Sequence, residues 1–255
     1  MLSINLQRDA IQMRDLSCLS KKEYPGRLII IGRDTSGSRI VVVYAITGRS
    51  SSSQARFLVQ EKDGIWVKPT DIKTLKTGNA DLLIYPAILH GKGVAVSNGL
   101  QTLDILASLP RFRDALRALK FALREWKYEP DAPSFTPRIS GCVLPDSRAA
   151  LSIIRRAKDG TSSKAFFKVP LMPGIGQMIS TYSGENCDPL PSFSGEPESI
   201  FIEKQSALET ARDVYDALRP QQDKTDLRVA VACLYIQYTD MALFDASIIN
   251  RSERS

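Results

Sequence analysis

The sequence has few of the residues that metal sites and acid–base sites most often use. It contains a single histidine, His90, and four cysteines, and no two cysteines form a C-x-x-C pair. These shortages argue against a Cys/His zinc site and against a Ser–His or Cys–His catalytic pair. We expect each cysteine to be a small core or surface residue. His90 lies in the turn-like stretch "ILHGKG", and we expect it to be structural or exposed.

The sequence also lacks long apolar runs and long basic runs. No stretch approaches the roughly 20 apolar residues of a membrane-spanning helix. The opening "MLSINLQRDAIQMRDL" lacks the apolar region of a signal peptide and predicts a short amphipathic helix or a frayed end. We therefore expect a cytoplasmic protein. The formal charge of +6 favours anionic partners, and the dispersed basic residues fit a small phosphorylated ligand better than a nucleic acid.

What the sequence does have is apolar stretches rich in β-branched residues, which predict strands. The 255 residues are 43% hydrophobic, enough for one large domain or two small ones. The first predicted strands lie at 28–32, at 40–47, on both sides of the turn "KDG", at 82–89 and at 94–97. They are almost continuously apolar, which is typical of a sheet covered on both faces.

After these strands the apolar spacing changes to a helical period. "LQTLDILASL" predicts a short helix that ends at Pro110, and "PRFRDALRALKFALREWK" predicts a longer one with Pro110 in its first turn. The longer helix carries one apolar stripe, formed by Phe112, Leu116, Leu119, Leu123 and Trp126.

The second half of the chain repeats this plan. Strands are predicted in "TPRISGCVL", "RAALSIIRRA", "KAFFKVPLM" and "MISTYS", and a Pro/Gly/Ser-rich loop follows over 183–199. "SALETARDVYDALRP" predicts a helix and "LRVAVACLYIQY" a final buried strand. This order of elements predicts two sheets with helices outside them.

A phosphate-binding P-loop is suggested by Gly32 and Gly37, which have the spacing G-x-x-x-x-G. The next two residues of a P-loop are Lys and Ser or Thr, whereas this chain has Ser38 and Arg39. The stretch that follows, "IVVVYAIT", also predicts a strand rather than the helix whose N–H groups would face the phosphate. We therefore interpret "RDTSGS" as the turn of a hairpin.

The arginines of this region still need an explanation. In "GRSSSSQAR", Arg49 and Arg56 flank four serines; they could form a phosphate cradle, or a polar loop with solvent-facing arginines. Arg27 and Arg138 stand where apolar strands begin, and an arginine in such a place needs a partner, because burying an unpaired charge is costly. A ligand or an internal ion pair could supply it, and Glu129 is a candidate partner for Arg27.

Four stretches, taken together and in this order, resemble the archaeal-type IMP cyclohydrolase family. They are "YPGRLIIIGRDTSGSRIVVVYAITGRS", "VAVSNGLQT", "YEPDAPSFTPRISG" and "MISTYS". The resemblance begins at Tyr24 and weakens in the C-terminal third. It implies a single domain over 24–255, with residues 1–23 as an N-terminal extension.

The resemblance implies an α+β fold, a four-layer αββα sandwich similar to N-terminal-nucleophile hydrolases. The implied reaction closes 5-formamidoimidazole-4-carboxamide ribotide (FAICAR) to inosine monophosphate (IMP) with loss of water, the last step of purine synthesis. No cofactor or metal is implied, and the expected partner is a purine ribotide monophosphate rather than a nucleic acid or a membrane. A homo-oligomer is plausible, because exposed sheet edges find partners. A related ribotide or amide hydrolase, a non-catalytic nucleotide-binding protein and an RNA-binding protein are the alternatives.

The implied chemistry needs little covalent machinery, because the substrate's carboxamide nitrogen attacks its own formyl carbon. The enzyme must orient both groups, stabilise the formyl oxygen and move protons. We predict that Glu129 orients the carboxamide or accepts its proton. We predict that Asn98 binds the base carboxamide, unless it is only a turn residue. Tyr85 would orient the formyl oxygen or a water, unless its ring is only part of the core.

The remaining predicted site residues bind substrate. Arg49 and Ser50 match the Arg-Ser pair of the family, and Arg56 follows at a longer distance than the family's second arginine. The other predicted ligands of the substrate are Tyr24, Arg27, Thr102 and Arg138. The family has an acid directly after Thr102; this chain has leucine there and the acid, Asp104, one residue later.

Overall fold

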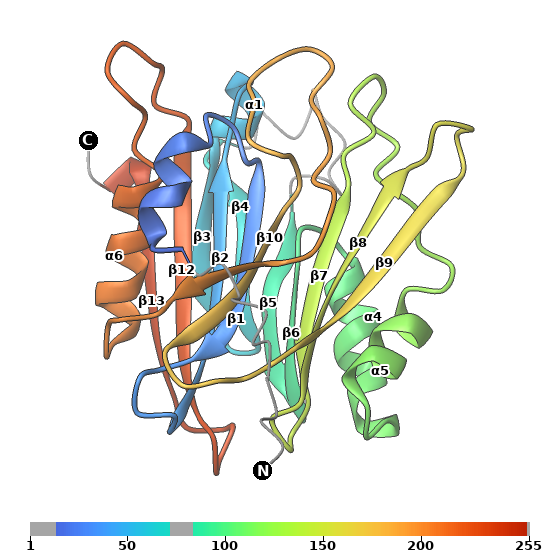
Figure 1. The fold of residues 1–255 in the computed structure, drawn as a ribbon, viewed down its shortest axis with the longest axis vertical. Helices are drawn as coiled ribbons and strands as arrows, with labels where there is room; N and C mark the ends of the chain where they lie inside the picture. Colours follow the sequence, from blue (N-terminus) through green and yellow to red (C-terminus); the bar gives the residue numbers. More distant parts are fainter. Residues whose placement is uncertain (1–13, 72–83, 254–255) are drawn as a thin grey trace, which may run out of the picture.

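The strands of this protein divide into two antiparallel sheets (Figure 1). The computed structural model describes residues 14–71 and 84–253. Within these residues the first sheet has six strands in the order β11-β10-β1-β2-β12-β13, and the second has seven in the order β3-β4-β5-β6-β7-β8-β9. The chain is therefore an α+β protein, and the sequence-based prediction of two sheets is confirmed.

The strands of the first sheet come from the first and last parts of the described chain. These six strands are β1 (Arg27–Arg33), β2 (Arg39–Thr47), β10 (Ile175–Ser180), β11 (Glu198–Phe201), β12 (Arg228–Gln237) and β13 (Phe244–Asn250). The second sheet comes from the middle of the chain. Its strands are β3 (Arg56–Glu61), β4 (Gly64–Pro69), β5 (Tyr85–Gly91), β6 (Gly93–Ser97), β7 (Arg138–Val143), β8 (Ala149–Arg156) and β9 (Ser162–Val169).

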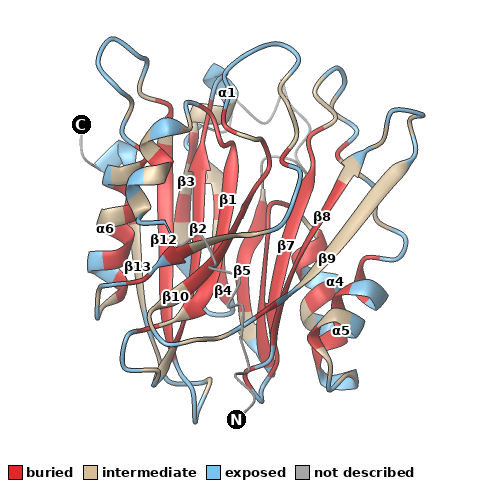
Figure 2. Cartoon of the chain, viewed as in Figure 1, coloured by how far each residue is buried: buried red, intermediate tan, exposed pale blue. Residues whose placement is uncertain are grey.

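The main apolar core lies between the two sheets. Ile29 and Val42 of the first sheet join Val96 and Leu151 of the second in one cluster of buried side chains. Alternate residues of the same strands, such as Ile30, pack on the outer face instead. The central strands are consequently buried on both faces (Figure 2), as their continuous apolar sequences predict.

Helices cover the outer face of each sheet. The 3₁₀ helix η1 (Leu16–Lys21) and α6 (Ala207–Ala217) pack on the first sheet, whereas α4 (Gln101–Ser108) and α5 (Ala115–Ala122) pack on the second (Figure 1). Leu19 of η1 is fully buried in the cluster beneath α6. The described residues before Tyr24, which were predicted to be an N-terminal extension, therefore pack against the first sheet. The helix predicted at the start of the chain lies outside the described residues.

The helix predicted from Pro110 onwards is wrong in its start. Pro110 belongs to a short 3₁₀ helix, η2 (Leu109–Arg111), and α5 begins only at Ala115. The carboxylate of Asp114 accepts a hydrogen bond from the N–H of Arg117 at 2.8 Å. This N-cap satisfies an orphan helical donor, which fixes the start of α5. The face turned to the sheet consequently contains the alanines 115, 118 and 122 as well as the predicted Leu119 and Leu123.

Other elements were not predicted from the sequence. The structure has strand β11 at the end of the predicted loop 183–199, and strand β13 follows β12, which was expected to be the final strand. The serine tract after Arg49 forms a short helix, α1 (Ser51–Gln54). The predicted strand 82–89 begins outside the described residues and its remainder corresponds to β5.

One side chain joins the edges of the two sheets. The Asn250 carboxamide on β13 accepts a hydrogen bond from the N–H of Leu58 at 2.8 Å and donates one to the Leu58 carbonyl oxygen at 2.9 Å. Leu58 lies on β3, the edge strand of the second sheet. An edge strand has unpaired backbone groups that attract other strands, and Asn250 satisfies two of them.

We predict that Asn250→Leu destabilises the protein by about 2–5 kcal/mol, because it leaves two buried backbone groups without partners. Urea unfolding monitored by circular dichroism measures this loss. Gln237→Leu is the matched control, because Gln237 is an exposed amide at the end of the neighbouring strand and should change stability by less than about 0.5 kcal/mol. Equal effects of the two substitutions would refute the bridging role of Asn250.

Candidate functional site

Polar side chains gather at one end of the sandwich, where several strands begin or end. Arg27, Arg56 and Tyr85 are the first residues of β1, β3 and β5, and Asn98 directly follows β6. Arg138 begins β7, next to the end of β6, because Ser97 pairs with Ser140. The antiparallel register therefore brings residues that are far apart in sequence to the same end of the sandwich.

Glu129 lies at the centre of this cluster, on the loop between α5 and β7. One carboxylate oxygen, Oε1, accepts hydrogen bonds from Arg27 Nη2 at 2.9 Å and from Asn98 Nδ2 at 3.0 Å. Arg138 Nη1 is 4.0 Å from the same oxygen. Only 3% of Glu129 is exposed. The predicted partnership of Arg27 and Glu129 is present, and it joins β1 of the first sheet to the second.

A chain of amide groups fixes the orientation of these side chains. Asn98 Oδ1 accepts hydrogen bonds from the N–H of Ile139 at 2.8 Å and from Gln101 Nε2 at 3.2 Å. Gln101 Oε1 in turn accepts one from Arg138 Nη1 at 3.0 Å. Gln101 is fully buried. The sequence does not indicate this burial, because a glutamine in the first turn of a helix is normally exposed.

Two tyrosines connect the sheets beside Arg27. The hydroxyls of Tyr44 on β2 and Tyr85 on β5 are 2.8 Å apart and fully buried. Burial and the neighbouring Tyr85 raise the pKa of Tyr44 well above its usual value, while Arg27 and Arg56 oppose the rise. The raised pKa keeps the Tyr44 hydroxyl neutral, so that it can donate a hydrogen bond. Tyr85 was predicted from the sequence as a site residue, whereas Tyr44 was not, because it lies in an otherwise apolar strand.

The cluster carries more positive than negative charge. Arg27, Arg56 and Arg138 are all buried, and Glu129 is the one carboxylate that pairs with any of them among the described residues. Arg27 Nε is buried without a hydrogen-bond partner in this part of the chain. Buried cations are normally paired. The unbalanced charge and the free donor therefore suit an anionic ligand.

Burial also changes the titration of Glu129. Desolvation raises the pKa of its carboxyl group above the ordinary value, and Asp131 adds to the rise, while Arg27 and Arg138 oppose it. Burial acts to lower the pKa of Arg27, but the Glu129 carboxylate together with the neighbouring tyrosines outweighs it, so that Arg27 stays charged. A carboxylate with a raised pKa is a stronger proton acceptor near neutral pH than an exposed one.

The predicted phosphate cradle has a different local structure. The Ser50 hydroxyl caps α1 and accepts a hydrogen bond from the N–H of Ser53 at 3.2 Å, and the N–H of Ser50 donates in return to the Ser53 hydroxyl at 2.9 Å. Arg56 Nε donates to the Ser53 carbonyl oxygen at 2.9 Å. The serine hydroxyls thus form a capping box rather than an open loop.

Arg49 lies at the rim of the site with Tyr24. Arg49 Nη1 donates to the Cys187 carbonyl oxygen at 3.1 Å, and its guanidinium is 5.8 Å from the centre of the Tyr24 ring. The Tyr24 ring stacks on Tyr182, with 5.5 Å between the ring centres. The Tyr182 hydroxyl is 2.8 Å from Thr136 Oγ1. Tyr182 and Thr136 were not selected as site residues, although both lie in stretches that resemble the family, because their hydrogen bond is a tertiary contact.

Thr102 is buried, but it serves the turn that carries Asn98. Its hydroxyl donates to the Gly99 carbonyl oxygen at 2.9 Å and is 2.5 Å from Ser97 Oγ. Asp104, whose place in the family pattern is shifted by one residue, lies on the outer side of α4. Its carboxylate accepts a hydrogen bond from Trp126 Nε1 at 2.8 Å. Neither residue contacts Glu129.

The cysteines and the histidine lie apart from this cluster. All four cysteines are free thiols, and burial raises the pKa of Cys142 to about 12, which keeps that thiol protonated and unreactive. The ring of His90 packs against Phe244 at 4.6 Å. Within residues 14–71 and 84–253, no His, Cys, Asp or Glu side chains form a group suited to a metal ion. In the same residues no helix is long and apolar enough to cross a membrane.

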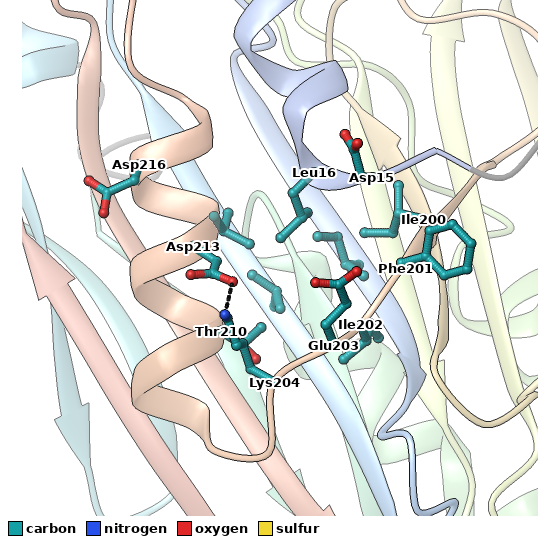
Figure 3. A pocket seen from close by; sticks show the side chains of 13 residues that line it. Asp15, Leu16, Ile200, Phe201, Ile202, Glu203, Lys204, Thr210, Asp213 and Asp216 are labelled. Atoms are coloured by element: carbon teal, nitrogen blue, oxygen red, sulfur yellow. Dashed lines mark ion pairs between the residues drawn. The ribbon is translucent and has the colours of Figure 1, made fainter.

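One hollow of the surface shares a residue with the cluster and another lies apart from it. A groove of about 730 Å³ has Arg138 in its wall, together with Trp126, Tyr128 and Phe135. A cavity of about 270 Å³ lies between η1, α6 and β11 (Figure 3). It has an apolar floor that includes Ile30 and Val214, and none of its lining residues belongs to the Glu129 cluster.

The geometry thus defines a binding site for a small, polar, anionic molecule. The site combines a buried carboxylate with amides and hydroxyls, and its arginines give it excess positive charge. A family model described as "IMP cyclohydrolase-like protein" matches residues 24–240, and the chain belongs to this family. Proteins named "IMP cyclohydrolase" from two strains of Halobacterium salinarum, R1 and NRC-1, are similar to it. Each is 27% identical over 194 residues, which cover 76% of this chain and 85% of the relative.

We predict that inorganic phosphate stabilises the protein against thermal unfolding, because it neutralises the excess arginine charge. At ten times its dissociation constant it should add about 1.4 kcal/mol. Differential scanning fluorimetry with increasing phosphate at constant ionic strength measures the gain. The gain should be lost in Arg56→Ala and kept in Arg148→Ala, since Arg148 is an exposed arginine paired with Asp146. An equal gain in all three proteins would show that the anion acts elsewhere.

Proposed function

We propose that this protein is an IMP cyclohydrolase that closes FAICAR to IMP with loss of water. The proposal rests on the burial of Glu129, whose carboxylate accepts hydrogen bonds from Arg27 at 2.9 Å and from Asn98 at 3.0 Å. The arginines around this carboxylate carry more positive charge than it balances. Membership of the IMP cyclohydrolase-like family and the names of the Halobacterium relatives support the choice of reaction.

The ring closure makes one C–N bond and releases one water. The carboxamide nitrogen attacks the formyl carbon, and the formyl oxygen leaves as water with one proton from the carboxamide nitrogen and one from the formamido nitrogen. Glu129 would accept the carboxamide proton, since its raised pKa gives the carboxylate the necessary basicity. Asn98, whose amide is fixed by Ile139 and Gln101, would hold the carboxamide in the plane of attack.

The formyl oxygen gains negative charge during the attack and needs donors that are already in place. The Tyr85 hydroxyl is buried, and its partner Tyr44 holds it at 2.8 Å. Arg27 has a buried and unused Nε donor on the same side of the interior. We assign Tyr85 and Arg27 to this oxygen. Arg138, held on Gln101, would keep the carboxylate of Glu129 charged rather than bind the reacting atoms.

The 5′-phosphate would bind toward the rim, between Arg56 and Arg49. Arg56 is buried next to the tyrosine pair, and Arg49 is partly exposed beside Tyr24. Ser50 would contribute through the position of α1 rather than as a free hydroxyl, because the capping box uses its oxygen. Thr102 would position Asn98 through the Gly99 turn.

We also propose a more specific fold than two sheets with outer helices. Helices outside two face-to-face sheets correspond to the four-layer αββα arrangement of N-terminal-nucleophile hydrolases, and this supports the assignment. A single domain over 24–255, a cytoplasmic location and a homo-oligomer remain predictions. The proposed partner is the purine ribotide monophosphate, FAICAR or IMP, rather than a nucleic acid.

We expect the purified protein to convert FAICAR to IMP without added cofactor, and Glu129→Gln to lower kcat by about 10²–10⁴-fold, as loss of a general base does. Absorbance or chromatography follows IMP formation, and calorimetry with IMP shows whether the variant still binds nucleotide. Binding without turnover in the wild-type protein would favour a non-catalytic nucleotide-binding protein. Turnover of another ribotide or amide, but not of FAICAR, would favour a related hydrolase.

Arg49, at the rim of the site, makes a separate prediction. Arg49→Ala should raise KM by about tenfold with little change in kcat, because a phosphate contact far from the reacting atoms stabilises the ground state and the transition state alike. Steady-state kinetics with FAICAR measures the two constants. Arg219→Ala is the control, since Arg219 is an exposed arginine paired with Asp216. A fall in kcat with unchanged KM would contradict the placement of the phosphate.

A further inference from the structure

Trp126 and Asp104 form a contact that the reaction described above does not use. Trp126 follows α5, and Asp104 lies on α4 with its side chain on the outer side of the second sheet. Trp126 Nε1 donates to Asp104 Oδ2 at 2.8 Å. Both residues line the surface groove that also contains Arg138. The hydrogen bond therefore fixes the indole ring at the mouth of the groove.

The fixed indole ring covers the guanidinium of Arg138. The guanidinium carbon lies 4.9 Å from the ring centre, which is within cation–π distance. Arg138 Nε also donates to the Lys127 carbonyl oxygen at 3.0 Å, and Lys127 directly follows Trp126. The segment 126–127 thus holds Arg138 from two directions, while Gln101 holds Nη1 at 3.0 Å.

These contacts keep Arg138 pointed at Glu129 instead of the groove. Nη1 is 4.0 Å from Glu129 Oε1, a distance at which an interaction between charges depends strongly on position and on access of water. Without the indole cover, the guanidinium has an open groove of about 730 Å³ beside it. Arginine is a long and flexible side chain, so the cover determines where its charge stays.

We infer that Asp104 and Trp126 are positioning residues, which hold Arg138 against the buried carboxylate of Glu129 and so set the pH range in which that carboxylate is charged. The inference rests on the proposed role of Glu129 as proton acceptor. Asp104 and Trp126 act through Arg138 and touch no reacting atom.

The direction of the effect follows from the groups that face Glu129. These are Arg27 from β1 and Arg138 from β7, which lower its pKa, and Asp131 from its own loop, which raises it. If Arg138 moves away or becomes hydrated, one of the two lowering charges weakens and the pKa of Glu129 rises. A proton acceptor with a higher pKa is charged only at higher pH, so the acidic limb of the pH–rate profile must move upward.

The test measures the titration of Glu129 directly and through activity. Carbon-13 NMR of glutamate-labelled protein follows the Glu129 carboxyl, assigned by its loss in Glu129→Gln, and the pH dependence of kcat/KM with FAICAR follows the same group. Trp126→Leu and Asp104→Leu should both raise the midpoint by about 0.5–1 pH unit. Arg138→Gln should raise it at least as much.

Conservative variants separate positioning from mere stability. Asp104→Asn keeps an oxygen that accepts the indole hydrogen bond and should restore the wild-type midpoint, while Trp126→Phe keeps a ring over Arg138 and should shift the midpoint less than Trp126→Leu. Arg113→Ala, an exposed change at the start of the α5 region, should leave the midpoint unchanged. Thermal melts identify any variant that does not fold.

The inference is overturned if folded Trp126→Leu and Asp104→Leu proteins titrate like wild type, even where their activity is lower. It is also overturned if Asp104→Asn shifts the midpoint as much as Asp104→Leu. If the wild-type protein does not convert FAICAR, the proposed function fails, but the NMR titration still decides whether these residues position Arg138.

Discussion

A carboxylate buried between arginines is the interaction on which the site depends. The Glu129 carboxylate pairs with Arg27 of the first sheet and with Arg138 of the second. It also accepts a hydrogen bond from Asn98, which directly follows β6. Removing one partner of such a pair leaves an uncompensated buried charge, which costs about 3–5 kcal/mol. The pair is therefore both a junction between the sheets and a source of reactivity, because the burial that makes it costly also raises the pKa of Glu129.

The fold supplies what this interaction needs. Apolar side chains fill the space between the sheets and keep water away, while the polar groups are confined to one edge where strands begin and end. Antiparallel pairing fixes the register of those ends, so that Arg27, Tyr85, Asn98 and Arg138 approach one another without any motif that is continuous in sequence. The site is consequently buried at its base, whereas Arg49 at its rim is exposed.

Much of the architecture could be predicted from the sequence, because strands buried on both faces are continuously apolar and their boundaries carry turn residues. An arginine beside an apolar strand also predicts a partner, and Glu129 is that partner for Arg27. Local capping chemistry was less visible: Asp114 sets the start of α5 and Ser50 converts the serine tract into α1. Gln101, Tyr44 and β13 were missed because their roles come from tertiary contacts, which a single sequence does not display.

A structure of the protein with bound IMP would show whether the substrate's reacting atoms lie against Glu129. We expect the hypoxanthine ring to lie within hydrogen-bond distance of Glu129 and Asn98, with the formyl-derived carbon toward Tyr85 and the phosphate between Arg56 and Arg49. IMP bound instead in the cavity beneath α6 (Figure 3), or in the outer groove without contact to Glu129, would contradict it.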